Sequence, residues 1–137
     1  MILVDTSVWI DYYNGVESWQ CDMLDKALSE EQIITGDIIL AEILQGFEKE
    51  PDFIKARQAM DHLVCIQLGG KELAIQAAIN FRFLRSKGVT IRKTIDMLIG
   101  TWCIESGAGL LHNDKDFDRM SRYLPLRTIS ADNTYGR

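Results

Sequence analysis

Short apolar runs that lack any polar alternation are the feature that most limits the folds open to this chain. A strand without polar alternation is buried on both faces, and parallel sheets covered by helices on both sides contain such strands. The stretches between the runs carry helical periodicity, so the pattern predicts an α/β fold with a mostly parallel central sheet in a three-layer α/β/α arrangement. The predicted strands are residues 2–4, 33–35, 64–68, 110–112 and 127–129.

Apolar residues spaced i, i+3, i+4 and i+7 predict the helices between these strands. A short helix follows Asp5, Thr94 is expected to cap the helix after it, and Gly88 ends the long helix that precedes Thr94. The other predicted helices span residues 17–29, 37–49, 71–87, a segment beginning at Pro51, and a segment from Asp114 to the residue before Pro125. Because no repeat, linker or low-complexity segment interrupts this alternation, we expect one domain over residues 1–137.

The composition is that of an ordinary folded protein, with 47% hydrophobic and 26% charged residues. No apolar run approaches the roughly 20 residues that a membrane helix needs, and no basic leader precedes residue 2, so a cytoplasmic location is expected. Three cysteines without a Cys-x-x-Cys pair cannot form a disulfide framework or a zinc site, and we expect all three to be buried: Cys21, Cys65 and Cys103.

Four carboxylates occupy positions where a ligand site of such a sheet would lie. Asp5 and Asp114 each follow a predicted strand, and ligands of open α/β sheets bind beyond the carboxyl ends of the strands. Glu42 falls on a largely apolar helix face, and Asp96 lies in the first turn of its helix between apolar neighbours. Each has a purely structural alternative: Asp114 could cap a helix, Asp96 could complement a helix dipole, and Glu42 could pair with a basic side chain.

Four hard oxygen ligands without nearby His or Cys suit Mg²⁺, with Mn²⁺ as the second choice. Such a site lowers the pKa of bound water and clamps the oxygens of an in-line displacement, so it points to phosphodiester hydrolysis. A P-loop is absent, and Ser7 stands where an aspartyl-phosphate phosphatase would have a second aspartate. Ser7 also lacks the Gly-x-Ser-x-Gly setting of a hydrolase nucleophile.

The net charge of −5 hides a basic region. No acidic residue lies between Glu72 and Asp96, where five basic residues are candidates for RNA binding: Arg82, Arg85, Lys87, Arg92 and Lys93. A second basic set follows Asp114 and comprises Lys115, Arg119, Arg122 and Arg127. Either set could be a solvated helix face, but cationic arms beside a metal cleft are what a phosphate backbone requires.

The chain also resembles a known family, the PIN-domain ribonucleases, and specifically the VapC-type toxins of toxin–antitoxin pairs. The resemblance covers essentially the whole chain and rests on four motifs in order: Met-Ile-Leu-Val-Asp5-Thr-Ser, Leu-Ala-Glu42-Ile-Leu-Gln-Gly, Thr-Ile-Asp96-Met-Leu-Ile-Gly, and Leu-Leu-His-Asn-Asp114-Lys-Asp-Phe-Asp. His112 departs from the family pattern, since many relatives have a small hydroxyl residue at that position.

This resemblance implies that Asp5, Glu42, Asp96 and Asp114 hold Mg²⁺ or Mn²⁺, with Asp116 as an auxiliary ligand. It implies that Thr6 or Ser7 orients Asp5. The implied activity is cleavage of structured RNA, either tRNA or rRNA, which inhibits translation. The implied assembly is a homodimer that a cognate VapB-type antitoxin neutralises.

Aromatic residues near the first two carboxylates suggest where that antitoxin would bind. Tyrosine and tryptophan combine a large contact area with a polar group, so a groove opening toward Glu42 is expected to be lined by some of Trp9, Tyr12, Tyr13, Trp19 and Phe47. Core packing is the alternative for these rings. Two other functions stay open at this point: a PIN-like module that binds RNA without cleaving it, and a metal-dependent DNA nuclease or phosphatase.

Overall fold

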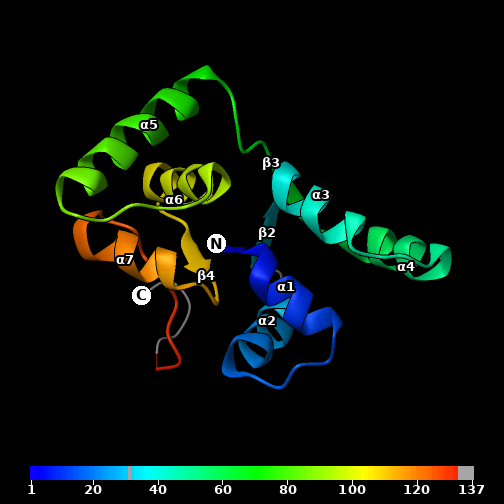
Figure 1. Ribbon diagram of the computed structural model, residues 1–137. Coiled ribbons are helices and arrows are strands. Elements are labelled where there is room, and N and C mark those ends of the chain that lie inside the picture. The colour runs from blue at the N-terminus through cyan, green and yellow to red at the C-terminus, as the bar shows by residue number, and fades with distance from the viewer. Residues whose placement is uncertain (31, 133–137) are drawn as a thin grey trace.

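The computed structural model describes residues 1–30 and 32–132, which alternate strands and helices along the chain (Figure 1). The strands are β1 (Ile2–Val4), β2 (Ile33–Gly36), β3 (Val64–Ile66) and β4 (Gly109–Leu111). The helices are α1 (Thr6–Tyr13), α2 (Trp19–Ser29), α3 (Asp37–Gln45), α4 (Glu50–Met60), α5 (Lys71–Ser86), α6 (Thr94–Ser106) and α7 (Lys115–Tyr123).

The four strands form one parallel sheet in the order β3-β2-β1-β4. Leu3 of β1 pairs with Ile34 on one side and with Leu110 on the other, so the first strand of the chain is central. All four strands point the same way, which places the residues after β1 and after β4 at one edge of the sheet. The α/β fold class predicted from the apolar runs is therefore confirmed.

Helices flank this sheet on both sides (Figure 1). The helix α6 packs against β4 and α7, and α5 lies against the outer side of α6. On the other side of the strands, α1 packs against both α2 and α3, while α4 continues from α3. At the carboxyl edge, α1 and α3 begin almost directly after β1 and β2, and α7 begins a few residues after β4.

The core consists of the sheet and the apolar faces of these helices. Ile2, Leu3 and Val4 are fully buried, as expected of a central parallel strand. Gly100 lets α6 approach α7 closely, because a Cβ at this position would overlap the sulfur of Met120. This close approach brings the helix that carries Asp96 next to the helix that follows Asp114.

Two of the five strand predictions are wrong in part. β3 was expected to be buried on both faces, but Val64 is 65% exposed because β3 is an edge strand with one neighbour. Residues 127–129 make no full strand: Thr128 forms an isolated parallel bridge with Leu110, which accepts the N–H of Ile129. The segment therefore lies beside β4, but its pairing is limited to one residue.

Three smaller expectations also need correction. Thr94 is the first residue of α6 rather than its cap, and Lys93 occupies the cap position without a side-chain hydrogen bond. The helix expected over residues 37–49 ends at Gln45, because Gly46 follows as its C-cap. Cys65 is exposed on the edge strand, whereas Cys21 and Cys103 are buried as expected. Among the described residues, no helix combines the length and apolar character that spanning a membrane requires.

Candidate metal centre

Asp5 leaves the end of β1 and caps the first turn of α1. Its Oδ2 atom accepts the backbone N–H of Ser7 at 3.2 Å and the Ser7 hydroxyl at 2.6 Å. The side chain is buried, so these two donors offset part of the cost of removing a carboxylate from water. Ser7 is thus the residue that fixes the direction of the Asp5 carboxylate.

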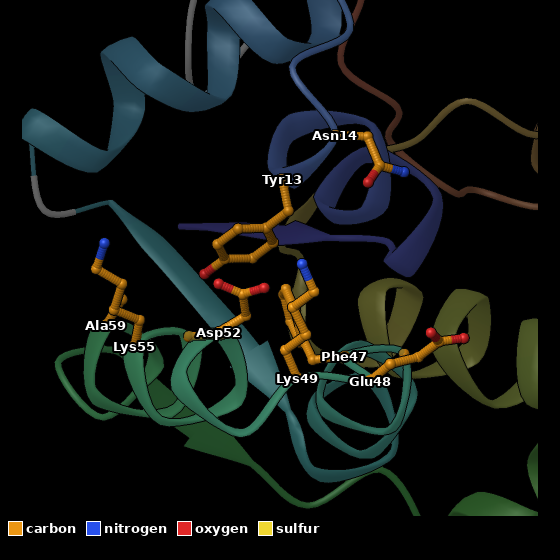
Figure 2. A pocket seen from close by; sticks show the side chains of 10 residues that line it. Tyr13, Asn14, Phe47, Glu48, Lys49, Asp52, Lys55 and Ala59 are labelled. Atoms are coloured by element: carbon orange, nitrogen blue, oxygen red, sulfur yellow. The ribbon is translucent and has the colours of Figure 1, made fainter.

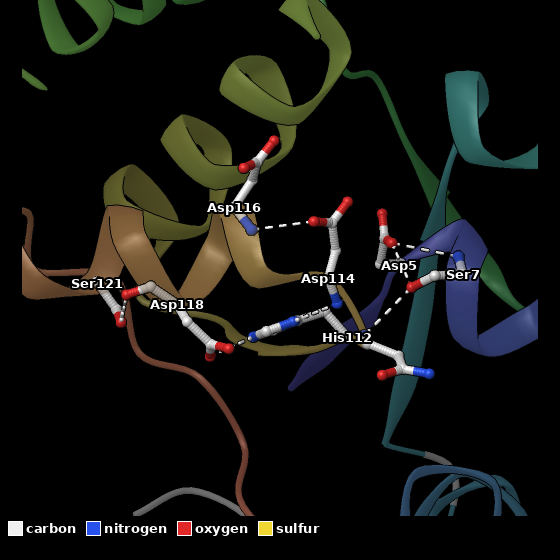
Figure 3. Close-up of polar contacts among 8 residues, drawn as sticks. Asp5, Ser7, His112, Asp114, Asp116, Asp118 and Ser121 are labelled. Carbon is white, nitrogen blue, oxygen red and sulfur yellow. Dashed lines mark hydrogen bonds and ion pairs between the residues drawn. The ribbon is translucent and has the colours of Figure 1, made fainter. Parts of the chain in front are cut away.

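The end of β4 carries Asp114 to the same edge (Figure 3). Asp114 is the N-cap of α7, and its Oδ1 accepts the N–H of Asp116 at 2.9 Å. The Ser7 hydroxyl accepts the N–H of Asn113 at 3.2 Å, which joins the segment after β4 to the segment after β1. Capping therefore accounts for one Asp114 oxygen and leaves the other available.

Asp96 enters the site from the first turn of α6. Its Oδ2 atom is buried and has no hydrogen-bond partner among the residues that the structure describes. One carboxylate oxygen from each of Asp96, Asp114 and Asp116 lies within 4.8 Å of the others, which is the spacing at which three ligands surround one ion. The alternative of a purely dipole-complementing Asp96 does not explain a buried oxygen that lacks a partner.

Burial and like charges raise the pKa values of two of these carboxylates. Burial, followed by the nearby charges of Asp5, Asp114 and Asp116, raises the pKa of Asp96 from 3.8 to about 7. Burial also raises the pKa of Asp5, although the hydrogen bonds from Ser7 oppose this shift. A nearby positive charge would therefore favour the ionised forms of both groups.

Glu42 lies half-buried on α3, and its Oε1 atom accepts the hydroxyl of Thr6 at 2.8 Å. Thr6 thus contacts Glu42, while its neighbour Ser7 contacts Asp5. The charge of Glu42 contributes to the raised pKa of Asp5, which places the two carboxylates within electrostatic range. The structure brings all four predicted carboxylates to the carboxyl edge of the sheet, as well as Asp116.

His112 has a structural role that its sequence position did not reveal. The ring is buried, packs against Phe117 with 5.1 Å between centroids, and accepts the N–H of Asp114 at Nδ1 over 3.1 Å. That bond leaves the ring proton on Nε2, which lies 3.6 Å from Asp118. Burial lowers the pKa of His112, so a neutral ring holds the backbone of Asp114.

Asp116 holds two arginines, an arrangement that the sequence analysis missed. Its Oδ1 accepts Nη1 of Arg119 at 2.8 Å, and its Oδ2 accepts Nε of Arg92 at 3.4 Å. The i, i+3 spacing of Asp116 and Arg119 on one helix was a usable signal for the first contact. The second contact joins residues 24 positions apart and depends on the fold.

The five predicted RNA-binding residues have different surroundings. Arg82 and Arg92 line an apolar groove of about 630 Å³ between α5 and α6. Arg85 and Lys87 instead lie over the rings of Phe81 and Phe83 at the end of α5. Lys93 lies near Asp96, whose pKa its positive charge lowers in part.

The predicted aromatic groove is only partly present. Tyr13 and Phe47 meet edge to face at 5.4 Å and line a pocket of about 680 Å³ between the end of α1, the segment that joins α3 to α4, and α4 (Figure 2). Trp9 is 2% exposed and belongs to the core beneath Tyr13, so it does not line a groove. Tyr12 donates its hydroxyl to Asp25 on α2, and neither Tyr12 nor Trp19 lines this pocket.

The donor set fits a hard divalent cation. The described residues bring one carboxylate oxygen from each of Asp96, Asp114 and Asp116 within 4.8 Å of one another, and hard cations prefer such ligands. The buried Oδ2 of Asp96 accepts no hydrogen bond from the described residues, so an ion would give it a partner. Asp5 lies close enough for its charge to raise the pKa of Asp96, which places it beside this group.

Comparison with known proteins places these motifs in a family. The family model of the PIN domain matches residues 2–123. The VapC ribonuclease Mb1587 of Mycobacterium bovis is 31% identical over 132 residues, covering 95% of this chain and 98% of that protein. Ribonuclease VapC11 of Mycobacterium tuberculosis strain H37Rv shows the same identity and coverage.

Solved structures share the fold at lower identity. FitAcB from Neisseria gonorrhoeae has a TM-score of 0.76 at 14% identity, covering 98% of this chain and all of that one. VapBC2 from Rickettsia felis, bound to a DNA fragment from its promoter, has a TM-score of 0.71 at 21% identity, and the match covers 94% of this chain and 98% of that one. The model match, the two relatives and the shared architecture agree, and the chain therefore belongs to the PIN-domain family, among its VapC-type ribonucleases.

Proposed function

We propose that this protein is a metal-dependent endoribonuclease toxin that cleaves structured RNA, either tRNA or rRNA, and so inhibits translation. The observation that carries the proposal is the convergence of Asp96 and Asp114 at the carboxyl edge, beside Asp5. The names of the VapC ribonuclease relatives support RNA as the substrate. We further propose that residues 1–137 act as one domain in the cytoplasm.

In this proposal Asp5, Glu42, Asp96 and Asp114 are the metal-binding residues, and Mg²⁺ is the expected ion, with Mn²⁺ as a substitute. The bound ion would activate water and stabilise the oxygens of an in-line phosphodiester hydrolysis. The residues of the chain supply the geometry: Ser7 directs Asp5, Thr6 directs Glu42, and His112 holds the backbone of Asp114. No protein nucleophile is required.

A cognate VapB-type antitoxin is the proposed regulatory partner. The pocket lined by Tyr13 and Phe47 supports this, since its apolar rings are flanked by Lys49, Asp52 and Lys55 (Figure 2). A partner helix with an apolar face could fill such a pocket. The structural neighbours include toxin–antitoxin complexes, of which VapBC2 from Rickettsia felis is one.

A homodimer is proposed as the working form. Ile75, Ile79 and Phe83 recur every fourth residue on α5, and each is about half exposed. A row of exposed apolar side chains on one helix supports a protein interface. Sedimentation of the wild type and of Ile79→Glu tests this. The wild type should sediment as a dimer and the variant should shift toward the monomer. A wild type that sediments as a monomer would contradict the proposal.

The decisive experiment is the sequencing of 5′ ends of cellular RNA after brief induction of the wild type and of Asp96→Asn. New 5′ ends at a few positions in tRNA or rRNA are expected with the wild type alone. Identical profiles would instead favour a PIN-like module that binds RNA without cutting it. Parallel assays of purified protein on RNA, DNA and nucleotides, with and without Mg²⁺, separate the ribonuclease from a DNA nuclease or phosphatase.

A further inference from the structure

Asp116 stands apart from the other carboxylates of the cluster because both of its oxygens are taken by arginines. Its side chain is 1% exposed, and it accepts Arg119 at 2.8 Å and Arg92 at 3.4 Å. Arg119 lies one helical turn further along α7, whereas Arg92 lies in the segment before α6. One buried carboxylate thus joins two segments that border the site.

The hydrogen bonds at Asp116 disfavour direct metal binding by this residue. Each of its two oxygens already accepts an arginine N–H, so an ion that bound Asp116 would have to displace or share one of these donors. Asp96 is in a different situation, since its buried Oδ2 has no hydrogen-bond partner among the described residues. Within one cluster, Asp96 therefore has an oxygen without a donor, whereas both oxygens of Asp116 are occupied by arginines.

The two arginines remain accessible to a ligand. The Arg92 side chain is 74% exposed and that of Arg119 is 47% exposed, although each is anchored at one N–H. A guanidinium group has five N–H donors in a fixed plane that matches the oxygens of a phosphate. An anchored arginine loses less conformational freedom on binding than a free one, so it binds a phosphate more effectively.

We propose that Asp116 is a positioning residue that holds Arg92 and Arg119 as a pair of phosphate-binding side chains beside the metal-binding carboxylates. This inference rests on the proposed function, because the phosphate it addresses is that of the RNA backbone. It assigns to Asp116 a role other than the auxiliary metal ligand that the family resemblance implies. It also joins Arg92 to Arg119 in one unit, whereas the sequence placed them in separate basic sets.

The test separates metal binding from RNA binding in the full-length protein. Mn²⁺ affinity is measured by calorimetry for wild type, Asp116→Asn, Asp114→Asn, Arg92→Gln and Arg119→Gln. Binding of a fluorescent oligoribonucleotide is measured by anisotropy in EDTA, and cleavage kinetics are measured at saturating Mn²⁺. Arg119→Lys tests conservative rescue, and Arg57→Gln on the exposed surface of α4 is the matched control.

Each glutamine variant is expected to weaken oligoribonucleotide binding and to raise KM by about fivefold or more, with Mn²⁺ affinity unchanged or slightly tighter. Arg119→Lys should recover part of the loss, and Arg57→Gln should match the wild type. Asp116→Asn should reproduce the RNA-binding loss, and adding Arg119→Gln to it should cause little further loss. The Mn²⁺ affinity of Asp116→Asn should stay near that of the wild type, whereas the Mn²⁺ affinity of Asp114→Asn should fall.

The inference is overturned if Asp116→Asn weakens Mn²⁺ binding as much as Asp114→Asn does, or if both arginine variants bind RNA like the wild type. Because both arginines are exposed, their variants should fold, so these results stay interpretable even where Asp116→Asn does not fold. A wild type that binds RNA through the arginines but never cleaves it would contradict the proposed function alone. A wild type that does not bind RNA would contradict both.

Discussion

The hydroxyl of Ser7 accepts the backbone N–H of Asn113 at 3.2 Å across 106 positions of sequence. The same hydroxyl donates to Asp5 at 2.6 Å, so one small side chain connects the ends of β1 and β4. These are the strands that carry Asp5 and Asp114 to the candidate metal centre. The relative placement of the two carboxylates therefore depends on a single oxygen atom as well as on strand pairing.

Replacing Ser7 with alanine should lower RNA cleavage by about 10–100-fold, the usual range for losing a group that orients a metal ligand. The fold should persist, because only two side-chain hydrogen bonds are lost. Cleavage rates over a range of Mn²⁺ concentrations provide the measurement. Ser7→Thr keeps the hydroxyl and is the control, and equal rates for alanine, threonine and wild type would contradict this role.

Asp5→Asn should abolish cleavage while the protein stays folded. In metal-free buffer the variant should melt at a higher temperature than the wild type, because a buried charge and its repulsion with Glu42 are removed. Thermal melting with and without Mn²⁺ measures both effects. Stabilisation of the wild type by Mn²⁺ should be largely lost in the variant, and a variant that melts lower than the wild type without metal would count against the charge argument.

The stability of the metal-free protein should fall as pH rises from about 4 to 7. The pKa of Asp96 is 3.8 in the unfolded chain and about 7 in the folded protein, so the folded state binds the extra proton throughout this window. By linkage, the decrease in the free energy of unfolding that is due to Asp96 reaches at most about 4 kcal/mol, and it levels off above pH 7.

Urea denaturation at several pH values, for wild type and Asp96→Asn, measures this contribution. His112 has a lowered pKa and acts in the opposite direction, so the difference between the two proteins is the informative quantity. The stability of Asp96→Asn minus that of the wild type should grow with pH up to about 7, and it should shrink when Mn²⁺ stabilises the wild type. A difference that does not change with pH would mean that Asp96 is ionised normally.

Reversing Arg85, Arg92 and Lys93 to glutamate should weaken RNA binding and flatten its dependence on salt. Each lost contact with a single-stranded phosphate should reduce the slope of log K against log salt by about 0.7. Binding titrations between low and high salt measure the slope. The triple variant Lys55→Glu, Arg57→Glu and Lys71→Glu, which changes the net charge by the same amount at other exposed positions, is the control. An equal slope in the wild type and in the variant at Arg85, Arg92 and Lys93 would show a merely solvated surface.

Alanine at Phe47 should weaken binding of the proposed cognate antitoxin by about tenfold or more, as expected for an aromatic residue that lines a docking pocket. Tyr13→Ala should act in the same direction, because the two rings are in contact. Tyr12→Ala should have a smaller effect, since Tyr12 faces Asp25 instead of the pocket. Affinities from calorimetry decide this, and equal affinities for all three variants and the wild type would exclude the pocket.

The sequence was most informative where burial and chain direction decide the structure. Val4 and Leu111 end two apolar runs, and the acids that follow them had to meet at one edge once the strands were parallel. The exposure of Val64 could not be predicted, because an apolar run does not show whether a strand has one neighbour or two. The same limit applies to Thr128, whose single bridge depends on how closely the end of the chain approaches Leu110.

Side-chain partners were harder to predict than positions. As an aspartate beside Asp114, Asp116 was expected to be a metal ligand. In the structure it accepts hydrogen bonds from Arg119, one turn along the same helix, and from Arg92, in a segment distant in sequence. Trp9 has the chemistry of an interface residue, yet it lies on the buried face of α1. Contacts such as that between Thr6 and Glu42 depend on how α1 and α3 pack, which sequence periodicity does not specify.

The strand order β3-β2-β1-β4 has a consequence for the newly made chain. β1 is synthesised before β2 and β3, yet one of its two neighbours in the sheet is β4, which is synthesised after them. Asp114 therefore meets Asp5 only after the chain between β1 and β4, including α6 with Asp96, has been made. A nascent chain that has not yet reached β4 holds Asp5 without Asp114 and Asp116, so these carboxylates cannot act together until β4 has paired with β1.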